Sequence, residues 1–246
     1  MYPMPGVELE VREKVLVIIL SEPEKFNPLS TATLNKIKQI IESYYENPKP
    51  LLITGKSKLF SAGIDLAEVA SATTPEEAQR PFKALVETIS TLLEYPAPTG
   101  VYLNGPAIAG GGEIALATDF IYASPGAWLQ WPEVKWNIIA PLFLALSKKT
   151  GLPRLASLNM DAGKIPAEDA YRVGIVSGLL SGLDDAVRAM EQVYDLYEAN
   201  RYAFKILLSE TRSWKKTALA EIAFNLVNAA ASEELIVRAR RFLSKK

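Results

Sequence analysis

Short apolar segments alternate with amphipathic ones along the first half of the chain, and this alternation restricts the fold more than any other feature. Helical patterns separate most of the strand-like segments, which have the length and composition of buried strands. The pattern therefore predicts an α/β fold with a mainly parallel sheet. The predicted strands lie at 7–11, 15–20, 51–54, 99–103 and 120–123.

Four helix starts lie between or after these strands. Ser30 is a good N-cap for a helix that we expect to reach about residue 46. Asp65 and Glu68 have the spacing of a capping box, which predicts a second helix. Pro75 begins a longer helix, expected to run to about residue 94, and the last of the four covers Gly111 to Ala117.

The second half of the chain is mainly helical. A block of helices this large cannot bury every apolar face alone, so we expect it to pack on the core or on a neighbouring subunit. The helical periodicity recurs at 139–149, 153–160, 182–198, 200–210, 216–230 and 232–244. We expect an α/β core over residues 1–190 and a helical C-terminal region over 191–246.

Composition narrows the chemistry. The 246 residues include no histidine and no cysteine, which excludes catalysis by Ser-His-Asp or Cys-His groups and makes a zinc site improbable. Acid–base work must then use carboxylates, lysines or tyrosines. A net charge of −1 indicates neither a nucleic acid nor a membrane partner. No signal peptide is apparent and the apolar runs are too short to span a bilayer, so we expect a cytoplasmic protein.

The run Gly110-Gly111-Gly112-Glu113 opens a predicted helix, whose first N–H groups are free to bind a developing oxyanion. Its spacing is that of neither a dinucleotide-binding nor a P-loop motif. Tight packing explains the glycines equally well, and an interaction with the helix dipole explains Glu113. Glu133 follows Trp131 and Pro132, where desolvation would raise its pKa and suit it to proton transfer. The alternative for Glu133 is a surface loop.

The segment Phe60–Leu66 has the same character, because it follows a strand and precedes a capped helix. Gly63 and Ile64 are placed to offer free N–H groups, and Asp65 is more simply a helix cap than a catalyst.

Two sets of cations accompany these segments. Lys25, Lys56 and Lys58 lie in loops where they are either solvated or phosphate-binding, and Arg238, Arg241 and Lys245 share one helix face, most simply a solvated one.

Taken together, five segments resemble the crotonase superfamily, the enoyl-CoA hydratase/isomerase family. They occur in the family's order and spacing and span most of the chain. The segments are Leu20–Leu29, Leu52–Gly55 with Phe60–Leu66, Asn104–Glu113, Trp131–Glu133 and Ala167–Val176. The resemblance implies a spiral of ββα units followed by a C-terminal helical region that forms trimers or dimers of trimers.

The resemblance also implies a reaction and its residues. The backbone N–H groups of Ile64 and Gly110 would bind the thioester carbonyl of an acyl-CoA. Glu113 and Glu133 would correspond to the two glutamates that hydrate a trans-2-enoyl-CoA to a 3-hydroxyacyl-CoA. No metal and no cofactor beyond the CoA of the substrate is implied, and fatty acid β-oxidation is a typical setting. The expected substrate-binding residues are Lys25, Ala62, Asp65, Leu66 and Gly111.

Two departures from the family pattern leave alternatives open. After Glu133 the hydratases have a glycine-rich run that lines the acyl pocket, so we expect bulkier side chains there to change acyl length and water access. The substituted positions are Asn137, Ala140, Pro141, Phe143 and Leu144. Near the C-terminus, Glu234–Arg238 replaces a family motif, so CoA contacts are expected to differ there. The alternatives are a Δ3-Δ2-enoyl-CoA isomerase that uses Glu133 alone and a non-catalytic acyl-CoA-binding protein.

Overall fold

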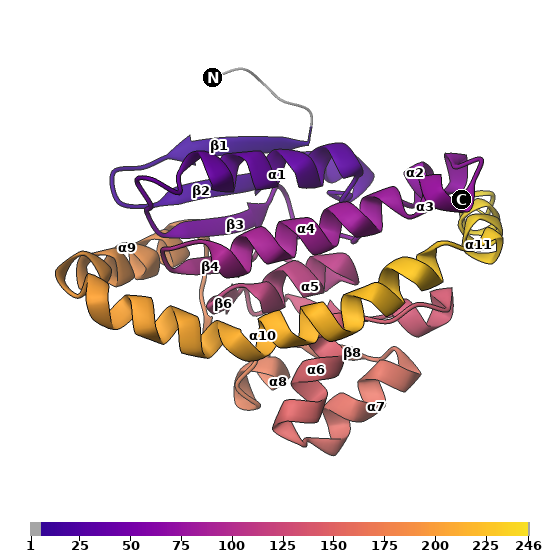
Figure 1. The fold of residues 1–246 in the computed structure, drawn as a ribbon. Coiled ribbons are helices and arrows are strands. Elements are labelled where there is room, and N and C mark those ends of the chain that lie inside the picture. The colour runs from indigo at the N-terminus through magenta and orange to yellow at the C-terminus, as the bar shows by residue number, and fades with distance from the viewer. Residues whose placement is uncertain (1–5, 246) are drawn as a thin grey trace.

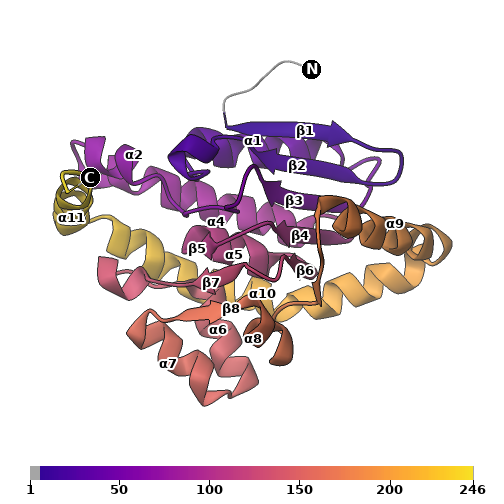
Figure 2. The ribbon, with the colours of Figure 1, turned by 180° about the vertical axis from the view of Figure 1, so that it is seen from behind.

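A six-stranded sheet forms the centre of the computed structural model, which describes residues 6–245 (Figures 1 and 2). Only β1 is antiparallel, and it pairs with β2 through a tight connection. The other neighbours are parallel, which confirms the predicted α/β class. In spatial order the strands are β1 (Val7–Val11), β2 (Leu16–Leu20), β3 (Leu51–Gly55), β4 (Thr99–Leu103), β6 (Phe120–Ala123) and β9 (Gly178–Leu179).

A second, three-stranded sheet lies below the first in Figure 2. It consists of β5 (Ala107–Ile108), β7 (Trp128–Gln130) and β8 (Lys164–Pro166). The sequence analysis did not predict these strands, because segments of two or three residues have no measurable periodicity. They matter for function, since β5 leads into the triple glycine and β7 leads toward Glu133.

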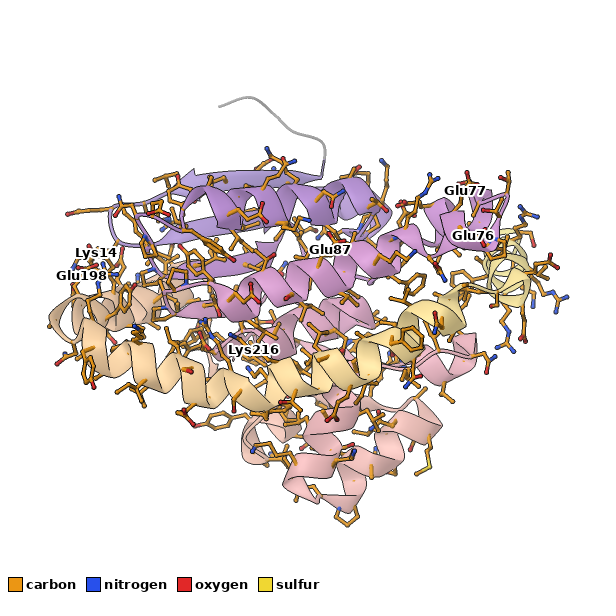
Figure 3. The ribbon with its side chains drawn as sticks, in the orientation of Figure 1. Lys14, Glu76, Glu77, Glu87, Glu198 and Lys216 are labelled. Atoms are coloured by element: carbon orange, nitrogen blue, oxygen red, sulfur yellow. The ribbon has the colours of Figure 1, made fainter. Side chains whose placement is uncertain are left out.

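Helices cover both faces of the large sheet. On one face α1 (Thr31–Ser43), α4 (Arg80–Glu94), α5 (Gly110–Ala117) and α10 (Arg201–Ala230) bury one large apolar cluster (Figure 1). On the other face α9 (Leu183–Ala199) packs Met190 and its neighbours against the strands (Figure 2). Charged side chains such as Glu87 on α4 and Lys216 on α10 stay at the surface (Figure 3).

The remaining elements are short. They are η1 (Pro23–Lys25), α2 (Leu66–Ser71), α3 (Pro75–Ala78), η2 (Glu133–Trp136), α6 (Pro141–Thr150), α7 (Pro153–Asp161), α8 (Ala167–Arg172) and α11 (Glu233–Leu243). Figures 1 and 2 place α11 beside α2 at one end of the molecule, although more than 150 residues separate them along the chain.

Three predicted helix features are corrected. The helix expected from Pro75 to residue 94 is broken into α3 and α4, because Pro81 has no N–H to continue the hydrogen-bond ladder. The capping box at Asp65 is only half formed. The Asp65 carboxylate accepts a hydrogen bond from Ala67 N at 2.8 Å, but Glu68 turns away to bind the N–H and hydroxyl of Thr31.

The third correction joins the helices expected at 200–210 and 216–230 into one, α10. The apparent gap arises because Arg212 occupies a buried position that periodicity assigns to an apolar residue. Its guanidinium pairs with Asp119 and donates to Ala97 O at 2.9 Å, while Lys215 Nζ donates to Thr118 O at 2.6 Å. These contacts fix the C-terminal end of α5, whose other end forms part of the site described next.

Candidate active site

The turn before α5 leaves a backbone donor free at the start of that helix. Ala109 has φ 52° and ψ −123°, a conformation that costs a non-glycine residue about 1–3 kcal/mol. Its own N–H is occupied by Gln130 O at 2.8 Å, which holds the turn against β7. Gly110 is the first residue of α5, and its N–H has no intrahelical acceptor.

A second donor comes from the loop between β3 and α2. Leu29 lies alongside this loop and bonds to the carbonyl of Gly63 at 2.8 Å and to the N–H of Asp65 at 3.2 Å, leaving the intervening N–H of Ile64 unpaired within the described residues. Gly63 has φ +87°, which favours glycine. The hydroxyl of Ser61 accepts from Gly63 N at 3.1 Å and donates to Asn27 O at 2.7 Å, so the loop is braced from both sides.

The two segments that carry these donors pack against each other. A Cβ on Gly63 would lie 3.1 Å from Gly110 N, and a Cβ on Gly110 would lie 3.7 Å from Ile64 N. Two N–H groups on adjoining segments, neither with an acceptor among residues 6–245 and one at a helix N-terminus, form a candidate site for a negatively charged oxygen. The predicted pair of donors is therefore brought together by segments from different parts of the chain.

Gly111 and Gly112 serve packing. A Cβ on Gly111 would lie 3.0 Å from the Ser61 Cβ, and one on Gly112 would lie 2.8 Å from the Trp131 indole. The predicted packing role and the predicted donor role are thus divided along the triple glycine, with the donor at Gly110 and packing at the other two.

Glu113 is 1% exposed and lies one turn into α5. Its carboxylate accepts hydrogen bonds from the N–H groups of Leu142 at 2.7 Å and Phe143 at 3.0 Å, the first turn of α6. Burial raises the pKa of Glu113 to about 7, and the two N–H donors oppose the rise. The indole N–H of Trp131 also lowers this pKa, although its geometry falls short of a hydrogen bond.

Glu133 is 6% exposed and begins η2. Burial raises its pKa well above the usual range, and the nearby charge of Glu113 raises it further. Its Oε2 is buried without a hydrogen-bond partner in the described part of the chain. Of the two carboxyl groups, Glu113 therefore loses its proton first as pH rises, and Glu133 keeps its proton to higher pH.

One cavity of about 1480 Å³ joins these groups. Its wall includes both donors, both glutamates and four of the five expected substrate-binding residues, namely Lys25, Ala62, Asp65 and Leu66. Gly111 is not among the lining residues, because it lies against Ser61. The neighbouring Lys56 pairs instead with Glu8, away from the cavity, at 2.6 Å.

Three cations near the C-terminal end also line this cavity, namely Arg238 and Arg241 on α11 and Lys245 just beyond it. Arg241 and Lys245 are exposed, as predicted, and the cavity is a neighbour that the prediction did not include. Sequence reasoning could not place them there, because periodicity shows which residues share a helix face and not what that face meets. Among residues 6–245 no three His, Cys, Asp or Glu side chains are grouped to hold a metal ion, and no helix is long and apolar enough to cross a bilayer.

A family model described as enoyl-CoA hydratase/isomerase matches residues 10–234. The chain belongs to this family. Similar relatives are a putative enoyl-CoA hydratase of Thermus thermophilus, 32% identical over 73% of this chain and 74% of the relative, and a crotonyl-CoA hydratase of Syntrophomonas wolfei, 34% identical over 70% and 68%.

Solved structures agree on the fold of this family member. An enoyl-CoA hydratase/isomerase from Mycobacterium paratuberculosis superposes with a TM-score of 0.86 at 17% identity, over 98% of this chain and 100% of that one. An enoyl-CoA hydratase from Bacillus halodurans gives 0.81 at 21% identity, over 96% and 99%. The expected crotonase fold is thereby confirmed.

The structure also shows where two bulky residues lie in the stretch that departs from the family's glycine-rich pattern, one of which, Phe143, replaces a glycine. Leu142 and Phe143 are fully buried and do not line the cavity, and the Phe143 ring stacks on Trp131 at 3.7 Å between centroids. Only their N–H groups face the site, where they bind Glu113. Pro141 lines the cavity in this stretch, so the expectation that large side chains fill the pocket is wrong for Phe143.

These two N–H donors were missed by the sequence analysis. A signal was present, since Pro141 is a favoured first residue of a helix and predicts free N–H groups at the next positions. Several apolar wall residues were missed as well, because they come from four separate elements. They are Phe82, Leu85, Ile138, Ile139, Leu226 and Leu235.

Proposed function

We propose that this protein is an enoyl-CoA hydratase that adds water reversibly to a trans-2-enoyl-CoA and forms a 3-hydroxyacyl-CoA. The observation that carries the proposal is that two unpaired N–H groups and two buried carboxyl groups line one cavity. The family membership narrows the substrate to acyl-CoA thioesters, and the named relatives include hydratases.

The first role belongs to the backbone. The thioester oxygen would accept hydrogen bonds from Ile64 N and Gly110 N, which stabilise the negative charge that develops there when water attacks the β carbon. One such donor is worth roughly 3–4 kcal/mol in measured enzymes. The strain at Ala109 supports this role, because strained backbone is retained where the surrounding structure needs the orientation.

The carboxyl groups divide the proton transfer. Glu113, whose ionised form is stabilised by two N–H donors, would take a proton from water as the water oxygen bonds to Cβ. Glu133, which holds its proton, would deliver it to Cα. A hydroxyl is thereby added to Cβ and a proton to Cα. Glu113 ends the reaction protonated, and Glu133 ends it ionised. No metal or separate cofactor enters these steps.

The rest of the cavity suits a CoA thioester. Lys25, Arg241 and Lys245 provide positive charge for phosphates, and Ala62 and Leu66 lie beside the oxyanion donors. Lys25 is already paired with Glu22 at 2.6 Å, so phosphate binding would compete with that contact. The apolar wall residues around Phe82 and Ile138 are suited to the acyl chain.

Isomerisation of a 3-enoyl-CoA is the second candidate, and one observation favours it. Both oxygens of Glu113 already accept main-chain N–H groups, which leaves Glu133 as the freer proton carrier. In that reaction Glu133 alone would move a proton between two carbons. Acyl-CoA binding without conversion is the third possibility.

Incubation of the purified protein with crotonyl-CoA separates these functions. A hydratase removes the conjugated enoyl absorbance, whereas an isomerase leaves crotonyl-CoA unchanged and creates that absorbance from a 3-enoyl-CoA. Turnover of the 3-enoyl substrate alone would refute hydration. Tight CoA binding with no turnover across a panel of acyl-CoA substrates would establish a binding protein.

We further propose a homotrimer, or a dimer of such trimers, formed in the cytoplasm through the helical C-terminal region. The support is the outer surface of α10, where large apolar side chains are exposed, with Tyr202 at 79% and Phe224 at 70%. Sedimentation equilibrium measures the assembly mass. A monomer at micromolar concentration would contradict this proposal and leave the proposed reaction untouched.

A further inference from the structure

Helix α11 touches both walls of the candidate active site. On one side it packs against α2, which begins two residues after Ile64, the proposed oxyanion donor. On the other side it reaches η2, which begins at Glu133. Only Ala231 and Ser232 separate α11 from α10, and Ser232 caps α11 by accepting from Leu235 N at 3.2 Å.

The link to η2 runs through Arg238. Its Nη1 donates to Lys135 O at 2.7 Å, and its Nε and Nη2 donate to Glu234 Oε1 at 3.0 and 2.5 Å. Glu234 lies one turn earlier on α11 and fixes the orientation of the guanidinium. A planar fork of donors can serve both partners at once, whereas a lysine ammonium cannot reproduce that geometry.

The carbonyl of Lys135 needs such a partner. It lies at the end of a four-residue 3-10 turn, where carbonyls have no intrahelical donor. The turn has little stability of its own and ends at Asn137 in the left-handed region, with φ 58°. Glu133 stands at its start, and the side chain of that residue contributes a buried oxygen without a partner.

The link to α2 runs through Arg240, which donates from Nε to Ala70 O at 2.8 Å and from Nη2 to Ala72 O at 2.9 Å. Apolar contacts reinforce both links. Ile236 and Ala239 pack with Val69 and Ile138, and the Phe242 ring meets Trp136 edge-on at 5.5 Å between centroids. Helix α11 is therefore anchored independently of Arg238.

We propose that Arg238 is a positioning residue for Glu133, acting through the carbonyl of Lys135 to hold η2 at the distance from the oxyanion donors that proton transfer requires. The catalytic half of this inference rests on the proposed function. The structural half, that Arg238 restrains η2, does not.

The kinetic test compares Arg238→Gln and Arg238→Lys with the unaltered protein. Both variants lose the fork, so kcat should fall roughly tenfold in each while KM changes less than about twofold, because misplaced catalytic groups reduce the rate of chemistry. Glu234→Gln should lower kcat less and in the same direction. Arg188→Gln is the matched control, since Arg188 pairs with Asp185 on its own helix, α9, away from the cavity.

A contact between Arg238 and a CoA phosphate would give the opposite result. The glutamine variant would then raise KM at constant kcat, and the lysine variant would restore it, which would overturn the proposal. Hydrogen exchange provides a readout without substrate. The amides of Asn137 and Ile138, which bond inside η2, should exchange faster in Arg238→Gln, and those of α5 should not. Unchanged exchange at η2 refutes the restraint, even if the protein converts no enoyl-CoA.

Discussion

Glu113 and Glu133 are the same amino acid, are both almost fully buried and line the same cavity, yet their surroundings differ in one respect. Glu113 meets two N–H groups at the start of α6, whereas Glu133 has an oxygen without a partner. Burial penalises the charge on both, and hydrogen bonding relieves that penalty at one. The backbone of α6 thus decides which carboxyl loses its proton first, and in the proposed reaction it would decide which one is the base.

The difference also indicates a role for the start of α6, a segment that departs from the family pattern. Phe143 places a buried side chain where the family has a glycine, and its stacking on Trp131 anchors the first turn of α6. An anchored helix N-terminus holds its N–H groups in place, so the Glu113 carboxylate is fixed as well.

The largest expected effect comes from removing each carboxylate in turn. Glu133→Gln should reduce both hydration and isomerisation by roughly 10²- to 10⁴-fold, since it removes the proton carrier of both reactions. Glu113→Gln should reduce hydration by a similar factor and isomerisation far less. Initial rates with a 2-enoyl-CoA and a 3-enoyl-CoA measure the contrast, and equal effects of both variants on both reactions would erase the distinction between the two glutamates.

A smaller effect is expected from a substitution that crowds Trp131, the aromatic residue beside Glu113. A Cβ on Gly112 would lie 2.8 Å from the Trp131 indole, so Gly112→Ala should displace that ring and destabilise the protein by about 1–3 kcal/mol. Gly126→Ala is the control, because nothing lies within 4 Å of its Cβ position. Thermal unfolding and hydration rates of the pair test the prediction. Equal stability of the two variants would show that the packing around Trp131 accommodates the added methyl group without cost.

The pH dependence of kcat/KM tests the assignment of charge. Glu113 must be ionised to accept a proton from water, and its pKa of about 7 predicts that kcat/KM rises roughly tenfold per pH unit up to that value. The rate should fall again once Glu133 loses its proton at higher pH. A stopped-flow profile measures both limbs, which belong to the coupled pair. A flat profile across neutral pH would contradict the assignment.

The smallest expected effect is on stability. A carboxyl whose folded pKa exceeds its unfolded value of 4.5 binds its proton more tightly when folded. The stabilisation is complete below that value and is lost as pH rises through about 7. Glu113→Gln should therefore unfold at a temperature less dependent on pH between 5 and 8 than the unaltered protein, by roughly 2–4 °C for each kcal/mol involved. Parallel melting curves would exclude a buried, proton-binding Glu113.

Some residues of the candidate site could be identified from the sequence, and others could not. Ile64, Gly110, Glu113 and Glu133 were candidates from local motifs, and the family resemblance supplied their expected roles; all four line the cavity. The role of α11 was not predicted, since the carbonyls that Arg238 and Arg240 bind lie more than 100 residues away along the chain. A carbonyl acceptor is present at every residue, so no sequence pattern can indicate which one a guanidinium will meet.

Sequence patterns were sufficient to predict an α/β core and a helical second half and to exclude histidine and cysteine from the chemistry, because periodicity and composition can be read from the chain alone. The distribution of charge between the two glutamates required the folded chain. It depends on where α6 begins relative to Glu113, and on how far both carboxyl groups lie from water. Those quantities come from packing between distant segments, and burial and donor geometry determine a pKa only once that packing exists.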